Sequence, residues 1–191
     1  MQDCRLVATN IACRRGDRIL FRGLSLAVEP GQMVHLAGPN GIGKSSLIRI
    51  LAGLLRPYAG TVERAGRLAL ADERLALDGH QTLERALGFW RRIDRSDDAV
   101  ADFGLANLLD VPVRFLSTGQ RKRAALARIA ASDASIWLLD EPLNGLDQHW
   151  SSMAQAAINA HRRSGGAVVI ASHQPLSVEG VRPLELLDYA E

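Results

Sequence analysis

Apolar and polar residues alternate along the first part of the chain, at 5–9 and again at 24–28. A period of two is typical of strands with one buried face, so these segments predict an antiparallel β-layer that opens the fold. The stretches 136–139 and 167–170 are instead apolar at every position. Strands of this kind are buried on both faces, as in a parallel sheet that helices cover. The pattern predicts an α/β fold.

Helical periodicity separates these strands. Residues 44–55 predict a buried helix that ends at Pro57 and Gly60, and 61–63 and 68–70 return as short strands.

The stretch from about 82 to 131 is mostly helical in pattern, with Thr82 as a candidate N-cap. We therefore expect a single domain over 1–191 with a helical insert over about 75–131. A further helix through 153–161 connects the two apolar strands, which makes them parallel.

Composition narrows the function classes. The chain has 191 residues, is 47% hydrophobic and carries a formal net charge of +2, too little to indicate a nucleic-acid partner. No apolar run approaches the roughly 18 residues that a membrane span requires. Residues 1–5 contain no apolar signal segment, and Cys4 and Cys13 form no disulfide or metal pattern, so we expect them to be small buried hydrophobes in a cytosolic protein.

The sequence GPNGIGKS at 38–45 lies between the apolar stretch 33–37 and the predicted helix. It fits the pattern G-x-x-x-x-G-K-[ST], in which glycines aim backbone N–H groups at phosphates and the helix adds its positive end. We expect Lys44 to reach the β- and γ-phosphates of a nucleoside triphosphate and Ser45 to hold Mg²⁺. The predicted phosphate-binding residues are Gly38, Pro39, Asn40, Gly41, Ile42, Gly43, Lys44, Ser45 and Ser46.

A second chemical pattern lies at the end of the apolar strand 136–139, where Asp140 and Glu141 follow directly. Ligands of open α/β sheets bind at the carboxyl ends of the strands. Asp140 is expected at the Mg²⁺, and Glu141 is expected to polarise the water that attacks the γ-phosphate. Alone, such a pair often only solvates a strand end; together with the phosphate loop it indicates hydrolysis.

The order of the motifs resembles the nucleotide-binding domain of ABC transporters. After the phosphate loop come LSTGQ at 116–120, LLDEP at 138–142, NGLD at 144–147 and ASH at 171–173. The resemblance implies a P-loop (RecA-like) core of the ABC ATPase type that hydrolyses ATP. It also implies that Ser117 and Gly119 of one subunit bind the ATP held by a second copy, that Asp147 couples the two sites, and that His173 contacts the γ-phosphate.

Three positions depart from the family pattern. Arg15 stands near the place of the aromatic residue that stacks on adenine, and Thr118 replaces a glycine. The segment 72–74, Asp-Glu-Arg, stands where a glutamine is expected after the strand 68–70, and Gln81 comes too late to replace it.

A narrower resemblance concerns the haem-exporter ATPases of cytochrome c maturation. It rests on GPNGIGKSSL at 38–47, LAGLLRPYAG at 51–60, the segment 13–21 and Phe89-Trp90. It implies a peripheral subunit on the cytoplasmic face of the bacterial inner membrane, working as a homodimer with integral membrane subunits, the haem exporter permease. The alternatives are another ABC exporter or a soluble ABC-type mechanical ATPase; a P-loop kinase or GTPase would not need LSTGQ.

The remaining charged residues are expected to be structural. The basic residues that follow LSTGQ are expected to form a solvated helix face rather than a nucleic-acid stripe: Arg121, Lys122, Arg123 and Arg128. Structural roles are likewise expected for His35, His80, His149 and His161.

Overall fold

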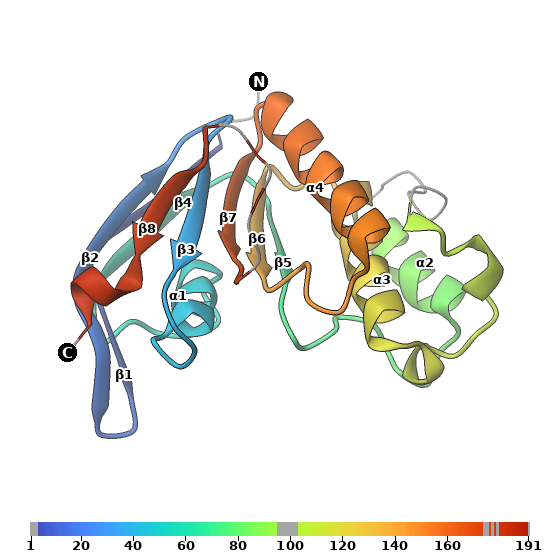
Figure 1. Cartoon of the computed structure of the whole chain (residues 1–191), viewed down its shortest axis with the longest axis horizontal. Coiled ribbons are helices and arrows are strands. Elements are labelled where there is room, and N and C mark those ends of the chain that lie inside the picture. Colours follow the sequence, from blue (N-terminus) through green and yellow to red (C-terminus); the bar gives the residue numbers. More distant parts are fainter. Residues whose placement is uncertain (1–3, 95–102, 174–175, 177, 179, 191) are drawn as a thin grey trace.

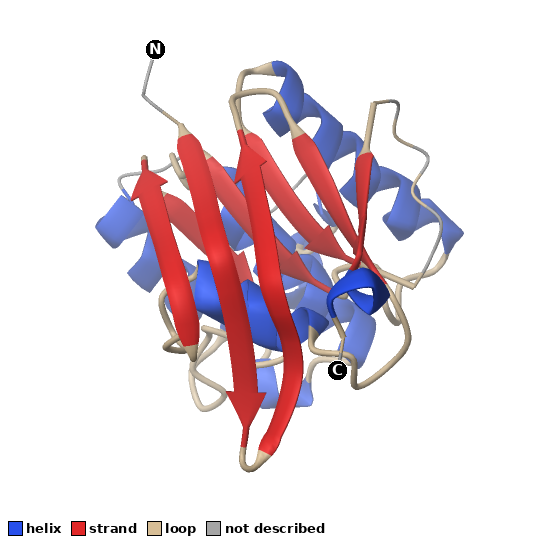
Figure 2. Ribbon diagram, turned by 90° about the vertical axis from the view of Figure 1, so that its left-hand side faces the viewer, coloured by secondary structure: helices blue, strands red, loops and turns tan. Residues whose placement is uncertain are grey.

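Two sheets flanked by helices make up the fold (Figures 1 and 2). The computed structural model describes residues 4–94, 103–173, 176, 178 and 180–190, so the part of the expected helical insert at 95–102 lies outside the described residues. One sheet has three strands and the other has five. The predicted α/β class with an extra antiparallel layer is confirmed.

The antiparallel sheet has the order β2-β1-β4, with β1 at Arg5–Arg15, β2 at Arg18–Val28 and β4 at Ala59–Ala65. β1 and β2 form one long hairpin, so both strands extend well beyond the predicted segments. β4 includes the predicted strand at 61–63. A Cβ at Gly60 would lie 2.4 Å from the carbonyl oxygen of Thr9, so this position accepts only glycine.

The parallel sheet has the order β5-β6-β7-β3-β8. Every residue of β6 and β7 is buried, as their apolar sequences predict. β8 was not predicted, because Arg-Pro-Leu-Glu has no apolar run; as an edge strand it tolerates proline. The strands span Leu68–Ala71 (β5), Ile136–Asp140 (β6), Ala167–Ala171 (β7), Met33–Ala37 (β3) and Arg182–Glu185 (β8).

Helices cover the parallel sheet and build the insert. α1 ends at Leu51 rather than at 55, because Leu54 and Leu55 both turn back to donate to the carbonyl of Arg49. In its described part from 103 to 117, the insert forms short 3₁₀ turns rather than a continuous helix. The helices are α1 (Lys44–Leu51), α2 (Leu83–Asp94), α3 (Thr118–Ala131) and α4 (Gln148–Arg163), with 3₁₀ turns at Ala106–Leu108, Val113–Phe115 and Leu186–Tyr189.

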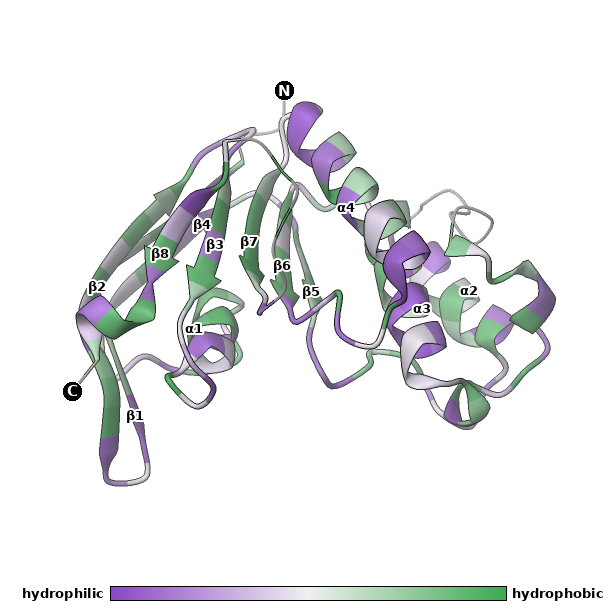
Figure 3. Cartoon of the chain, viewed as in Figure 1, coloured by the Kyte–Doolittle hydropathy of each residue, from purple (hydrophilic) through white to green (hydrophobic). Residues whose placement is uncertain are grey.

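Buried side chains form three clusters. The first lies between the antiparallel sheet, α1 and one face of the parallel sheet; the second fills the insert and includes residues of α2 and α3; the third lies between the other sheet face, α3 and α4. Figure 3 shows β7 hydrophobic along its length, in contrast to the mixed colouring of α4. The loops of the site therefore extend from a sheet that is packed on both faces.

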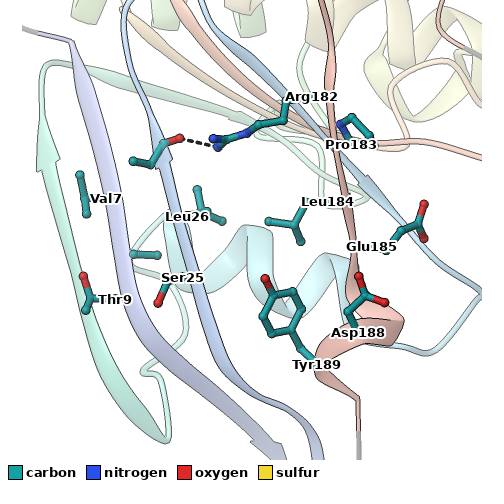
Figure 4. Close-up of a pocket in the computed structure, with 12 residues that line it drawn as sticks. Val7, Thr9, Ser25, Leu26, Arg182, Pro183, Leu184, Glu185, Asp188 and Tyr189 are labelled. Carbon is teal, nitrogen blue, oxygen red and sulfur yellow. Dashed lines mark hydrogen bonds between the residues drawn. The ribbon is translucent and has the colours of Figure 1, made fainter.

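The C-terminal segment joins the two sheets. Arg182 of β8 donates a hydrogen bond to the carbonyl of Ala27 in β2, across the open groove drawn in Figure 4. A short bridge between Phe21 and Ala190 holds the chain end on β2. The free edges of β2 and β8 are thus linked without a further strand.

His161 of α4 has a structural role. Its ring stacks on Trp137 of β6 with centroids 3.9 Å apart and planes 8° from parallel, and its Nε2 is buried without a hydrogen-bond partner. Burial lowers the pKa of His161 from 6.5 to about 4, against the raising effect of backbone hydrogen bonds. The neutral ring therefore packs on Trp137, a member of the third core cluster.

We expect acid to destabilise the fold through His161. Below pH 6.5 the unfolded chain takes up a proton that the folded chain refuses until about pH 4, so the free energy of unfolding falls as the pH is lowered across this window. His161→Phe keeps the stack and removes the titration. Urea denaturation at several pH values should show a shallower pH slope for the variant; parallel slopes would contradict the buried neutral ring.

Candidate functional site

The phosphate loop connects β3 to α1, the strand–loop–helix context that the sequence predicts. Gly43 is the N-cap of α1 with φ of 115°, and no side chain caps this helix. A Cβ at Gly43 would lie 3.0 Å from the ring of Phe21, so the loop packs closely on β2. Gly38 and Gly41 also have positive φ, 133° and 79°. The first N–H groups of α1 are thus left for an anion.

Lys44 is the buried cation of this loop, with 6% of its surface exposed. Its Nζ donates to the carbonyls of Gly38 at 2.7 Å and Pro39 at 3.1 Å. The ammonium group is thus held by carbonyls of the same loop whose backbone N–H groups are available to an anion. This arrangement suits a chain of phosphates, to which lysine contributes a point charge.

Ser45 and Asp140 lie together, as the sequence predicts for metal ligands. The Ser45 hydroxyl is hydrogen-bonded to Asp140, whose other carboxylate oxygen, Oδ1, is buried without a partner. Burial raises the pKa of Asp140; the Ser45 hydrogen bond and Lys122 lower it, and Glu141 and Glu73 raise it further.

This donor set fits Mg²⁺. A hard cation prefers hydroxyl and carboxylate oxygens and would supply the partner that Oδ1 lacks. Within the described residues, no group of three or more His, Cys, Asp or Glu side chains forms a metal cluster. Mg²⁺ usually keeps water and phosphate ligands beside one or two protein groups, so few protein ligands are expected.

Glu141 and His173 form the next pair. The backbone N–H of His173 donates to Glu141 Oε2 at 3.3 Å, and His173 Nε2 lies 3.0 Å from Glu141 Oε1. That oxygen is buried and accepts no well-aligned hydrogen bond. Glu141 has a left-handed backbone with φ of 49°, which is rare for a residue with a side chain. Its carboxylate is thus held next to Asp140 and the histidine.

Ser117, Gly119 and Asp147 form a separate group. Ser117 begins α3 in a capping box with Gln120, and Asp147 caps α4 by accepting from the N–H of Trp150. Gly119 packs against the loop before α4, since a Cβ there would lie 2.7 Å from the carbonyl oxygen of Gly145. Figure 1 shows the start of α3 well to the side of α1 and its phosphate loop. These residues are brought together with each other, not with the phosphate loop of the same chain.

The segment after β5 puts a carboxylate near the metal ligands. Asp72 is buried, pairs with Arg49 at 3.1 Å and accepts from the N–H of Arg74. Glu73 is exposed and close enough to Asp140 to raise its pKa. Gln81 lies in the insert, where its carbonyl accepts from Val113, so it does not replace the expected glutamine. Sequence reasoning missed Glu73, although its position next to a strand end was a signal.

The interpretation of the basic residues of α3 as a solvated face is wrong. Lys122 Nζ donates to the carbonyl of Glu141 at 3.0 Å. Arg123 donates to the carbonyl of Phe103 and stacks on Trp150, and Arg128 is 9% exposed and donates to the carbonyl of Leu70. Arg121 likewise donates to the carbonyl of Leu116. These cations stabilise loop and strand carbonyls around the site.

The β1–β2 hairpin packs against the phosphate loop and the start of α1. Cys13 is buried and hydrogen-bonded to Ser46, and burial raises the pKa of its thiol. Arg15 is exposed at the end of β1, close enough to Cys13 to lower that pKa. Cys4 is buried as well, so both cysteines are small buried side chains as expected.

The insert exposes apolar side chains. Phe89 is 51% and Ile93 52% exposed on α2, whereas Trp90 packs edge to face on Phe89 and donates to the carbonyl of Ala76. Phe89 is therefore exposed, whereas Trp90 is partly buried against the second core cluster. None of the helices in the described parts of the chain is both long and apolar enough to cross a bilayer.

Comparison with known proteins confirms the resemblance drawn from the motifs. The profile of the family described as ABC transporter matches residues 21–144. The chain is 74% identical over 189 residues to the cytochrome c biogenesis ATP-binding export protein CcmA of Novosphingobium aromaticivorans, with 99% of both chains covered. It is 54% identical over 178 residues to the protein of the same name from Sphingopyxis alaskensis, with 91% and 92% covered.

Solved structures agree on the fold. An ABC transporter ATP-binding protein from Pyrococcus furiosus superposes with a TM-score of 0.81 at 22% identity, covering 98% of this chain and 100% of that one. At this identity the likeness concerns the fold alone. Together with the family profile and the close relatives, it means that the chain is an ABC-type ATPase that belongs to the ABC transporter family and, within it, to the cytochrome c biogenesis ATP-binding export proteins.

Proposed function

We propose that this chain hydrolyses ATP with Mg²⁺ as the peripheral ATPase subunit of a haem exporter that serves cytochrome c maturation. The observation that carries the hydrolytic part is the meeting of three groups at one edge of the parallel sheet: Lys44, the Ser45–Asp140 pair and the Glu141–His173 pair. Each supplies a part that phosphoryl transfer needs. We also propose that 1–191 works as one domain, with the insert over about 75–131.

Each residue has a distinct role in this proposal. The N–H groups of the loop from Gly38 to Ser46 and the ammonium of Lys44 bind the phosphates. Ser45 and Asp140 would hold Mg²⁺, which neutralises charge on the transferred phosphoryl group. Glu141 orients and polarises the attacking water, and His173, 3.0 Å from the Glu141 carboxylate, contacts the γ-phosphate.

Two copies are needed to complete each site. Ser117 and Gly119 begin α3 on the side away from the phosphate loop of their own chain. Backbone N–H groups at a helix start bind anions, so in a head-to-tail dimer they would meet the ATP of the second copy. Asp147 caps the neighbouring helix α4 and would lie at the same interface.

The membrane part rests on the relatives and on the insert. Relatives at 74% and 54% identity carry names that include cytochrome c biogenesis and export. Exposed Phe89 and Ile93 on α2 provide an apolar surface that a partner would cover. We therefore propose that the chain binds integral membrane permease subunits at the cytoplasmic face of the inner membrane and has no nucleic-acid partner.

Lys44→Ala should weaken ATP binding by about 10- to 100-fold. The variant removes the only side-chain cation that the phosphate loop itself supplies, and a charge-assisted hydrogen bond contributes about 1.5–3 kcal/mol. Calorimetric titration with ATP and Mg²⁺ measures the change. Undiminished affinity in a folded variant would reject the phosphate-loop assignment.

Glu141→Gln should lower the rate of ATP hydrolysis by about 10²- to 10⁴-fold and leave ATP binding intact. The amide keeps the size and hydrogen bonding of the carboxylate but is not a base. ATP would then accumulate between two copies, and light scattering after size exclusion should report a dimer that requires ATP.

A Glu141→Gln protein that hydrolyses ATP at the wild-type rate would contradict the role of Glu141. A variant that is inactive yet monomeric with saturating ATP would contradict only the head-to-tail dimer. The two parts of the proposal are thus tested separately.

Deletion of the gene should abolish covalent c-type cytochromes, and the wild-type gene should restore them while the Glu141→Gln gene should not. Haem staining of membrane proteins measures this, and affinity purification of the chain should recover an integral membrane protein. Normal cytochromes in the deletion strain would reject the haem part, and the absence of any membrane partner would reject the transporter part.

A further inference from the structure

The left-handed backbone of Glu141 is held from two sides. Among the described residues other than glycine, only Asn10 and Glu141 have positive φ, and such a conformation persists only where the surroundings enforce it. The N–H of Glu141 donates to the carbonyl of Ala171 at 2.9 Å. Its carbonyl accepts from the ammonium of Lys122 at 3.0 Å. The second contact comes from a different part of the chain, α3.

Lysine is rare in this protein, which makes position 122 informative. Lys44 and Lys122 are its two lysines, and the remaining 21 of its 23 Lys and Arg residues are arginine. Both ammonium groups donate to backbone carbonyls at the candidate site: Lys44 to the phosphate loop and Lys122 to Glu141. A compact ammonium suits the approach to a single carbonyl, and a guanidinium can also donate to one carbonyl with one arm of its wider fork.

Lys122 lies one turn into α3, the helix that Ser117 caps. The start of this helix also packs on the loop between Glu141 and α4, since no Cβ fits between Gly119 and the carbonyl of Gly145. The next side chain of the helix, Arg123, stacks on Trp150 at the start of α4. The start of α3 and the segment 141–147 are therefore mechanically linked.

We propose that Lys122 is a positioning residue, which holds the backbone of Glu141 in its left-handed conformation and so ties the aim of the Glu141 carboxylate to the start of α3 in the same chain. The inference rests on the proposed role of Glu141 in hydrolysis. Lys122 acts through the carbonyl of Glu141 and not through contact with ATP.

One consequence concerns the two sites of a dimer. If Ser117 and Gly119 bind the ATP of the second copy, a displacement of α3 on binding moves Lys122 with it. The Glu141 carboxylate of the first site then responds to ATP in the second site. The coupling needs no distant pathway, because Lys122 lies five residues after Ser117 on one helix.

The test compares ATP hydrolysis by the full-length wild type, Lys122→Met and Lys122→Arg. Methionine is an unbranched side chain only one atom shorter than lysine and cannot donate, so kcat should fall by about 10- to 100-fold while KM for ATP stays within about twofold, as expected for a misplaced catalytic group. Arginine can still donate and should restore at least about a third of kcat. Arg163→Met, which removes an exposed cation at the end of α4, is the matched control and should keep wild-type kcat.

A second readout is independent of activity. With ¹⁵N-labelled lysine side chains, the NMR spectrum of the whole chain contains two ammonium signals, and the spectrum of Lys44→Ala retains only that of Lys122, which assigns both. The hydrogen-bonded ammonium of Lys122 should exchange its protons with water more slowly than free lysine does. Exchange as fast as in free lysine would overturn the proposal, and this measurement decides even if the methionine variant fails to fold.

The outcomes separate this inference from the proposed function. Full activity of Glu141→Gln would remove the hydrolytic role on which the inference rests. An inactive Glu141→Gln combined with wild-type kcat in Lys122→Met would overturn the role of Lys122 alone. A change in KM with unchanged kcat would mean that Lys122 acts on bound nucleotide, which also contradicts positioning through the Glu141 backbone.

Discussion

The site depends on the buried strand β6, which places the carboxylate of Asp140 at its end and that of Glu141 directly after it. β6 lies between β5 and β7, and all five of its residues are buried. Asp140, the last residue of this strand, is therefore buried, with a raised pKa and with no hydrogen-bond partner for Oδ1. This arrangement costs free energy unless a cation or a hydrogen-bond donor contacts the carboxylate. The Ser45 hydroxyl and the ammonium of Lys122 reduce this cost in part, and a metal ion would complete the balance.

Helices α1 and α3 differ in how the backbone N–H groups at their starts are satisfied. α1 begins at Gly43 without a side-chain cap, so its first N–H groups stay available to phosphate. α3 begins with a capping box, in which Ser117 and Gln120 satisfy each other's backbone N–H groups. The first start is open for binding, whereas the second is locally stable and can be displaced as a unit. Such a difference suits one helix that binds its own nucleotide and another that approaches a second copy.

The sequence predicted the parts of the fold whose pattern was strong. Apolar runs and the spacing of glycines are local features of the sequence. They predicted the strand at 33–37, the buried strands β6 and β7, and the phosphate loop. β8 was not predicted, because most of its residues are exposed and its pairing with β3 joins segments that are far apart in the sequence. At the site, the sequence predicted that Ser45 and Asp140 lie together, because the loop after β3 and the end of β6 are at the same edge of the parallel sheet. The left-handed backbone of Glu141 could not be predicted, because contacts from α3 and β7 impose it.

The basic residues of α3 show why charge patterning misled. From Ala124 to Ile129 all six residues are buried, so the helix has no continuous solvated face on which cations could lie. Its alanines allow neighbouring elements to approach closely, and the long basic side chains extend past them to the nearest carbonyls. An arginine or lysine there therefore satisfies backbone acceptors that strands and loops leave open. The solvated interpretation assumed an amphipathic helix, and an alanine-rich helix packed between two apolar clusters does not meet that condition.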